Sequence, residues 1–305
     1  MLRHACSGKG LRVLSPKALP SGDAESAWVL EWKEPSCAPR LKEEKTTLLA
    51  SALIEAFERH LSEFSRLVPV EVGLGRRFSY VYTDSGHLGL AYAPQDEPIP
   101  AKILSAPSLI DIVRYAWQHP VASSLALAAA NAAMSALIDR DRGVVRFGGD
   151  VVEELGVGAG DRVALVGYVE GVASALIDRG ARLVVYEDNP MHRRWAERSG
   201  LTVLPGSQIV LGVEDYDYLI ATGASLIDPR LVHVLLEARG KKSVRAAVVG
   251  PSSSFHPYAA VRLGFNVIAG SYVPRVFRET VLRLVKAGYG FRAIRGFVEK
   301  WVWGG

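Results

Sequence analysis

Cysteine is scarce in this chain of 305 residues, which contains only Cys6 and Cys37. Both lie near the N-terminus, so a disulfide between them would tie only the least regular segment of the chain. A disulfide scaffold is therefore excluded, and a reducing, cytoplasmic setting fits the sequence better.

Recognised catalytic and metal-binding motifs are also absent. The 7 histidines are scattered and form no H-x-H, HExxH or CxxC pattern, so the sequence identifies neither a metal site nor a metal. There is no G-x-S-x-G nucleophile elbow and no P-loop. Among the histidines, only His256, which follows a run of serines, lies near the expected site.

The sequence has neither a strong charge nor a convincing membrane span. Lys and Arg total 36 against 32 Asp and Glu, a weak excess that does not predict a nucleic-acid surface. The first residues lack the apolar run of an export signal. Residues 121–138 carry no charge, but they are mostly alanine with Asn131 near the centre, which is unfavourable in a membrane span. They predict a buried helix of a soluble domain.

The first half of the chain predicts an irregular arm followed by an α+β domain. Residues 1–40 contain four prolines and no sustained periodicity. Apolar residues then recur at helical spacing between 49 and 64, and strict alternation with turn sequences predicts a three-stranded antiparallel meander. Together with two further helices, these elements predict a domain over residues 41–145. The expected strands are 70–74, 78–82 and 88–92, and the further helices are 108–119 and 121–139.

From residue 146 to the end, apolar segments alternate with helical ones. Strands that are apolar throughout are buried on both faces, which predicts a mostly parallel sheet covered by helices. The expected fold is therefore α/β, with a doubly wound, Rossmann-like domain over residues 146–305. The expected strands are 162–169, 182–187, 202–204, 218–222, 246–250 and 266–269, and the expected helices are 171–179, 190–199, 229–238 and 274–287.

In such a sheet, ligands bind beyond the carboxyl ends of the strands, where the strand order reverses. Gly167 follows the first strand, but its segment reads G-x-x-x-G rather than G-x-G-x-x-G, and Glu170 would repel a phosphate. Glu187 closes the second strand, where Rossmann domains hold the acid that bonds ribose hydroxyls. This combination favours a nucleoside-type ligand such as S-adenosylmethionine over NAD. The alternatives are a plain strand-to-helix turn at Gly167 and a solvated carboxylate at Glu187.

Glycine and small hydroxyl residues follow three further strands. They offer backbone amides and short donors that suit a carboxylate, a phosphate or a planar polar ring. The same hydroxyls also cap helices, so a structural role is the alternative. The candidates are Thr222, Gly223 and Ser225 after one strand, Gly250, Pro251 and Ser252 after the next, and Gly270 and Ser271 after the last.

Asn131 lies among alanines in the uncharged segment. A buried amide needs partners, and small neighbours let a ligand or another backbone approach it. We expect Asn131 to orient a ligand in the same crevice as Glu187 and the loop 222–225; a hydrogen bond across the domain boundary is the alternative. In that crevice Glu187 would be either a strong hydrogen-bond acceptor or a base with a raised pKa.

The ordered set of segments resembles the DUF364 family, described as "putative heavy-metal chelation" proteins. Val-Gly-Leu at 72–74, Gly-Leu-Ala-Tyr at 89–92 and the alanines around Asn131 resemble its N-terminal half. The resemblance implies an enolase-N-terminal-like domain joined to a Rossmann-like domain similar to methyltransferases, with a site between them. Departures at 169–171 and 228–230 lie in strand-end loops, where substrate detail carries over least. Segments that resemble the C-terminal half are 166–168, 185–187, 220–226, 249–252 and 269–271.

The leading hypothesis is an enzyme that binds a small polar heterocycle or chelator between its two domains. The resemblance implies a flavin-, pterin- or siderophore-like molecule and a transfer, condensation or hydrolysis reaction. Asn131 and Glu187 are the expected catalytic residues, and the strand-end residues named above, with Gly167 and Glu187, are the expected cradle. The expected ligand is S-adenosylmethionine, a nucleoside or a metal chelate. Neither a nucleic acid nor a membrane is expected as a partner, and the sequence leaves open whether the protein forms a homo-oligomer. The alternative is a non-catalytic module that sequesters a metal chelate.

Overall fold

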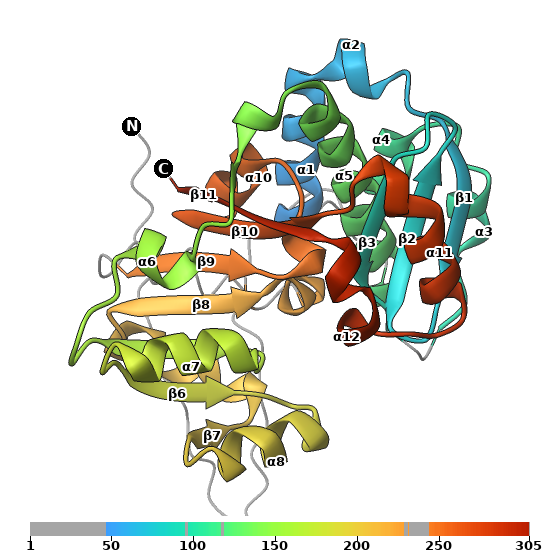
Figure 1. Cartoon of the computed structure of the whole chain (residues 1–305). Coiled ribbons are helices and arrows are strands. Elements are labelled where there is room, and N and C mark those ends of the chain that lie inside the picture. The colour runs from blue at the N-terminus through green and yellow to red at the C-terminus, as the bar shows by residue number, and fades with distance from the viewer. Residues whose placement is uncertain (1–46, 95–96, 117–118, 229–230, 232–243, 305) are drawn as a thin grey trace, which may run out of the picture. The chain divides into compact units, whose positions relative to one another are not determined.

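A computed structural model describes most of the chain after the N-terminal region (Figure 1). Residues Thr46–Gly305 form one compact unit. The arm expected over residues 1–40 and nearly all of the helix expected over 229–238 lie outside the described residues, and the division at residue 145 stays a prediction. The described residues are 47–94, 97–116, 119–228, 231 and 244–304.

Three antiparallel strands form the first sheet, in the order β1-β2-β3. The turn between β2 and β3 contains Gly86, whose φ of 82° is one that glycine adopts readily. The meander predicted from the alternating pattern is therefore confirmed. Its strands are β1 (Pro69–Leu74), β2 (Phe78–Thr83) and β3 (Leu88–Tyr92).

The alanine-rich segment forms α5 (Pro120–Arg140), which packs directly on β3. A Cβ added to Gly89 of β3 would collide with the backbone of Ala128 and Ala132, so glycine and alanine together allow the close approach. Although α5 is long and apolar enough to cross a membrane, its apolar window is 100% buried inside the protein, as in the core helix of a soluble protein. The buried helix predicted over residues 121–138 is confirmed.

The other helices of this part of the chain are shorter. The first begins after Thr47, whose Oγ1 accepts a hydrogen bond from the N–H of Ala50 at 3.2 Å and so caps the helix. The helix expected over 108–119 ends earlier, at Arg114. These helices are α1 (Leu48–Arg59), α2 (Leu61–Phe64), α3 (Ala101–Leu104) and α4 (Leu109–Arg114).

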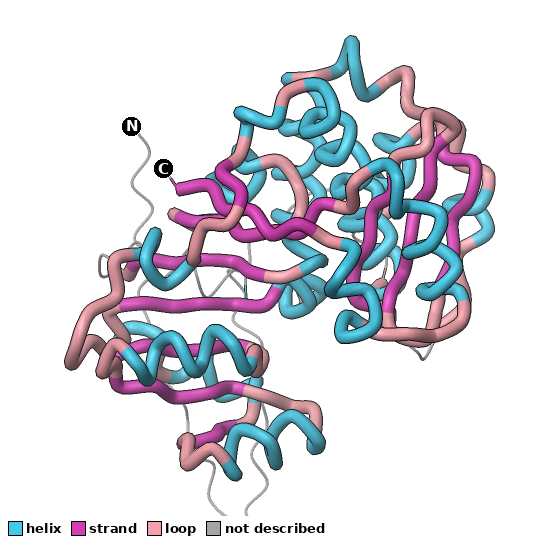
Figure 2. Tube along the Cα trace, in the orientation of Figure 1, coloured by secondary structure: helices cyan, strands magenta, loops and turns pink. Residues whose placement is uncertain are grey.

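The second sheet has eight strands in the order β4-β11-β10-β9-β8-β5-β6-β7. Figure 2 shows its strands in magenta, apart from those of the first sheet. Strands β5 to β10 run parallel to one another, whereas β11 is antiparallel to its two neighbours, β10 and β4. The predicted mostly parallel, Rossmann-like sheet is confirmed. Its strands are β4 (Arg146–Phe147), β5 (Arg162–Val166), β6 (Arg182–Tyr186), β7 (Thr202–Leu204), β8 (Tyr218–Thr222), β9 (Arg245–Val249), β10 (Val267–Tyr272) and β11 (Glu299–Gly304).

Both faces of this sheet are covered. Successive strand residues point to opposite faces, so Val163 and Leu165 of β5 join a core with α6 and α7, while Ala164 and Val166 join the core on the other side. The helices next to this sheet are α6 (Val151–Leu155), α7 (Glu170–Asp178), α8 (Pro190–Arg198) and α10 (Pro257–Arg262). The last two helices, α11 (Arg278–Lys286) and α12 (Phe291–Ile294), instead pack on β2 and β3 of the first sheet.

Other details also differ from the sequence-based expectation: α11 begins at Arg278 rather than at residue 274, and β4, α6 and α12 were not expected. The strand expected over 162–169 ends at Val166, because Gly167 has a φ of 83° and turns the chain. The antiparallel strand β11 was not expected, since its charged start at Glu299 and Lys300 hides the pattern of its buried Trp301 and Val302. The strand order reverses between β5 and β8, which places the expected ligand-binding point at their carboxyl ends.

Candidate functional site

A cleft of about 550 Å³ opens at the carboxyl ends of β5, β6 and β8, where the strand order reverses. We call it the cleft from here on. The position is the one expected for a doubly wound sheet. Residues that line it include Gly167, Glu187, Asp188, His192, Thr222 and Ser225.

Glu187 is held by several polar contacts at the wall of the cleft. Its carboxylate accepts hydrogen bonds from the backbone N–H groups of Tyr168 and Asn189, both at 2.8 Å. The Nδ1 atom of His192 lies 3.4 Å from its Oε2, and only 11% of the Glu187 side chain is exposed. A carboxylate held in this way is preorganised to accept a further hydrogen bond from a ligand.

The hydrogen bonds decide the ionisation of Glu187. Burial alone would raise the pKa of this carboxyl, but hydrogen bonding from His192 and from the two backbone N–H groups outweighs burial and lowers the pKa. Of the two roles considered for Glu187, the geometry supports an ionised hydrogen-bond acceptor rather than a base with a raised pKa.

The turn after β5 passes very close to the end of β8. A Cβ on Gly167 would lie 2.5 Å from Oγ1 of Thr222, so a larger residue would push the two strand ends apart. Thr222 Oγ1 is in turn hydrogen-bonded to Ser225 Oγ at 2.8 Å. The structure thus brings together Gly167, Glu187, Thr222 and Ser225, four of the residues expected to form the cradle.

The other candidates lie elsewhere and are absent from the lining of the cleft: Gly250, Pro251 and Ser252 follow β9, whereas Gly270 and Ser271, expected after the last strand, lie within β10. In the turn η5 (Pro251–Ser253), the Oγ of Ser252 accepts a hydrogen bond from the Tyr92 N–H at 2.8 Å. The Cβ that Gly223 lacks would lie 2.5 Å from the backbone nitrogen of Ser253, so the loop after β8 touches this turn. Gly250 precedes the turn with a φ of 108°, and Gly270 packs under Trp301.

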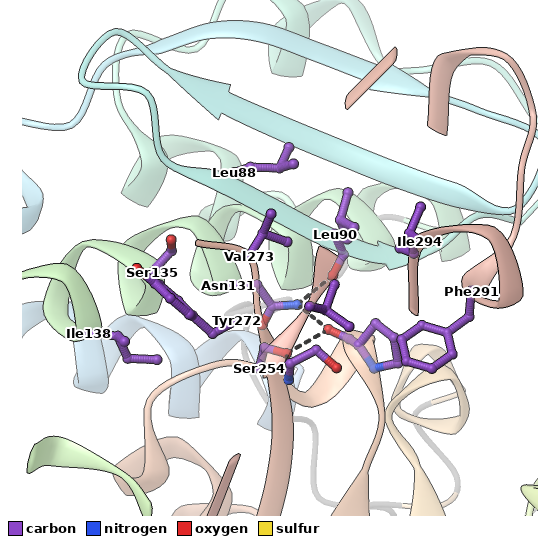
Figure 3. Close-up of a pocket in the computed structure, with 13 residues that line it drawn as sticks. Leu88, Leu90, Asn131, Ser135, Ile138, Ser254, Tyr272, Val273, Phe291 and Ile294 are labelled. Carbon is purple, nitrogen blue, oxygen red and sulfur yellow. Dashed lines mark hydrogen bonds between the residues drawn. The ribbon is translucent and has the colours of Figure 1, made fainter. Parts of the chain in front are cut away.

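Asn131 lines a different and much smaller cavity of about 20 Å³, together with Pro251 and Ser271 (Figure 3). We call this the Asn131 cavity. The side chain of Asn131 is buried and bonds to the carbonyl oxygens of Leu90 and Pro251. The linings of the two cavities share no residue, so the structure corrects the expectation of one crevice shared by Asn131 and Glu187.

Two histidine environments were not found from the sequence. His192 lies in the first turn of α8 because Asn189 caps that helix, accepting hydrogen bonds from the N–H groups of Met191 and His192. The sequence signal that could have found His192 is its position three residues after Asn189, a residue type that often caps a helix. His256, which was expected near the crevice, instead bonds to His60, Nε2 to Nε2 at 3.1 Å, beside a separate surface groove.

The described residues contain no group of three or more His, Cys, Asp or Glu side chains that could hold a metal ion. The cleft is lined by two adjacent acids, Glu187 and Asp188. Such a lining attracts cationic or hydrogen-bond-donating molecules.

Comparison with known proteins agrees with this fold. A solved structure of a DUF364-family protein from Pyrococcus horikoshii is 20% identical, with a TM-score of 0.66, and the match covers 85% of this chain and 100% of that chain. Another from Desulfitobacterium hafniense is 18% identical, with a TM-score of 0.64 and coverage of 84% and 98%. Both are described as proteins with unknown function, and the similarity shows the fold alone. No curated protein matches the chain.

Two family models match the sequence itself. DUF4213 matches residues 58–134 and DUF364 matches residues 150–303, and both carry the description "Putative heavy-metal chelation". Because the DUF364 match spans half of the chain and the structural similarity extends over most of it, this chain belongs to the DUF364 family.

Proposed function

We propose that the protein binds a small, non-phosphorylated molecule in the cleft, with Glu187 accepting hydrogen bonds from its hydroxyl groups. A nucleoside or S-adenosylmethionine has this chemistry. The observation that carries the proposal is the position of the Glu187 carboxylate, held by two backbone N–H groups at the end of β6, where doubly wound sheets bind ribose hydroxyls. The cleft volume of about 550 Å³ lies within the usual range of small-molecule sites.

The surroundings of the cleft disfavour a phosphate. Helix N-termini bind phosphate through free N–H groups, but α7 begins with Glu170, and Asn189 occupies the N–H groups of Met191 and His192 in α8. The carboxylates of Glu187 and Asp188 add negative charge beside these helix ends. A dinucleotide such as NAD is therefore expected to bind more weakly than a nucleoside.

The pairing of Glu187 with His192 supports an enzymatic role. A carboxylate beside Nδ1 orients an imidazole and leaves Nε2 to exchange a proton with a substrate. We infer that His192 transfers the proton in a transfer, condensation or hydrolysis reaction and that Glu187 orients it. We therefore expect the protein to convert a bound heterocyclic or chelator-like substrate. The variant His192→Ala should still bind this substrate but should no longer convert it.

Sequestration of a metal chelate is the second candidate. The acidic lining of the cleft favours a cationic cargo, and the family description names heavy-metal chelation. A sequestering protein would retain the chelate unchanged over many binding cycles. An enzyme would return a chemically altered product, so analysis of the recovered molecule separates the two functions.

Isothermal titration calorimetry tests the binding proposal with adenosine, S-adenosylmethionine and NAD as probes. We expect adenosine or S-adenosylmethionine to bind more tightly than NAD. Glu187→Gln should weaken that binding by about 10- to 100-fold, since hydrogen bonds to charged groups contribute about 1.5–3 kcal/mol. Glu170→Gln is the matched control, because Glu170 is an exposed acid at the same end of the sheet but outside the cleft lining. Tighter binding of NAD, or equal loss in both variants, would contradict the proposal.

A further inference from the structure

The side chain of Asn131 has a defined orientation. Its Nδ2 donates to the carbonyl oxygens of Leu90, at 2.6 Å, and Pro251, at 3.0 Å (Figure 3). Carbonyl oxygens only accept, so a flipped amide would set its own oxygen against both of them and is excluded. Oδ1 is thus left buried, with no hydrogen-bond partner among the described residues. A buried acceptor of this kind is unfavourable unless a donor reaches it.

We propose that Asn131 is a positioning residue for the cleft: Oδ1 binds one water molecule in the Asn131 cavity, while Nδ2 holds the turn η5 against β3. The part of the proposal that concerns ligand affinity rests on the proposed function of the cleft. The water site and the attachment of η5 stand without it.

The size and lining of the Asn131 cavity suit a single water molecule. Its volume is about 20 Å³, and a buried water needs roughly 10–15 Å³ measured in this way. The residues that line it carry no charge, so a neutral occupant is favoured. The Oγ of Ser254, which also lines the cavity, accepts from the Ser271 N–H at 2.8 Å and donates to the Pro251 carbonyl at 3.0 Å. Its second lone pair can accept from the same water that donates to Asn131.

The turn η5 connects Asn131 to the cleft. Asn131 holds the carbonyl of Pro251, and the next residue, Ser252, accepts the backbone N–H of Tyr92 at 2.8 Å. Tyr92 is one of the residues that line the cleft. The loop after β8 also touches η5, at Gly223. A displacement of η5 therefore moves two parts of the cleft wall at once.

A crystal structure of the full chain tests the water site directly. We expect one ordered molecule within hydrogen-bond distance of both Asn131 Oδ1 and Ser254 Oγ. A cavity without density there, or a protein donor on Asn131 Oδ1, would show that the water site is wrong.

The positioning role is tested with Asn131→Leu and Ser252→Ala, which remove the tie at its two ends. Both should weaken adenosine binding by about 3- to 30-fold, and the double variant should lose little more than one of them, since both act through the same turn. Ser123→Ala is the matched control: Ser123 is also buried on α5, but its hydroxyl bonds to Ala116, away from β3 and η5.

Hydrogen exchange of the Tyr92 amide gives a readout that needs no ligand. We expect this N–H to exchange at least about tenfold faster in Asn131→Leu than in Ser123→Ala, because η5 no longer holds Ser252 against it. Equal exchange in the two variants would overturn the positioning role even if Asn131→Leu is less stable. If the wild-type protein binds no adenosine, the proposed function fails, whereas the exchange of the Tyr92 amide still decides the role of Asn131.

Discussion

Gly167 and Thr222 approach so closely that a Cβ on Gly167 would lie 2.5 Å from Oγ1 of Thr222. The contact joins the carboxyl ends of β5 and β8, the two strands between which the strand order reverses. The walls of the cleft near Glu187 therefore depend on a residue without a side chain.

Replacement of Gly167 by alanine should damage both stability and the cleft. Gly160 offers the matched control, because its φ of 82° resembles the 83° of Gly167 but its added Cβ would meet nothing within 4 Å. Gly160→Ala should lose about 1–2 kcal/mol from the backbone conformation alone. Gly167→Ala should lose more in urea unfolding, and combination with Thr222→Ala should recover part of the excess, since the Cβ of residue 222 would still lie 3.1 Å away. Equal losses for Gly160→Ala and Gly167→Ala would show that the contact with Thr222 is unimportant.

His256 should make the protein less stable in mild acid. Burial, with the positive charges of His60 and Arg59, lowers the pKa of His256 from 6.5 to about 4. The unfolded chain therefore takes up a proton below pH 6.5 that the folded protein resists until about pH 4. Stability should fall as pH drops through this window, by up to about 3 kcal/mol.

His256→Asn provides the comparison for that pH dependence. His256 caps α10 by accepting the N–H of Tyr258 at Nδ1, at 3.1 Å, and asparagine is a good replacement for a cap. Urea unfolding at several pH values should show a smaller loss in this variant between pH 6.5 and 4. Identical pH profiles for the two proteins would contradict the assignment.

The buried Arg278 should make Asp139 important for stability. Only 1% of the Arg278 side chain is exposed, and its Nη2 lies 2.7 Å from Oδ1 of Asp139. Asp139→Asn leaves this buried charge without its counter-ion and should cost about 3 kcal/mol or more in urea unfolding. Glu279→Gln, which removes an exposed partner of Arg283, should change stability by no more than about 0.5 kcal/mol. A small effect of Asp139→Asn would mean that the carbonyl oxygens of Val273 and Gly86, which also accept hydrogen bonds from Arg278, suffice.

Local patterns predicted most of the fold. The alternation of apolar and polar residues between 70 and 92 indicates strands buried on one face of a sheet. The fully apolar segments after residue 146 indicate strands buried on both faces. Both patterns can be recognised from the sequence alone. The strand β11 was missed because its charged start hides its short apolar part, which becomes a strand by pairing with β10. The helix predicted over residues 108–119 was too long, because no glycine or proline marks its end at Arg114.

The site was predictable only where it follows from strand order. Glu187 was found because the end of the second strand is a recurrent place for an acid in this fold. Asn131 was recognised as a buried amide, but its partners Leu90 and Pro251 lie 41 and 120 residues away in sequence, so its place outside the cleft could not be derived. The contact of His192 with Glu187 likewise depends on the direction in which α8 leaves the sheet.

A crystal structure of the full chain with adenosine tests the central claim most directly. We predict density for the nucleoside in the cleft, with its ribose hydroxyls within hydrogen-bond distance of the Glu187 carboxylate and its base against the loops after β5 and β8. Density for the nucleoside at another place on the protein, or in the cleft with no contact to Glu187, would contradict the account.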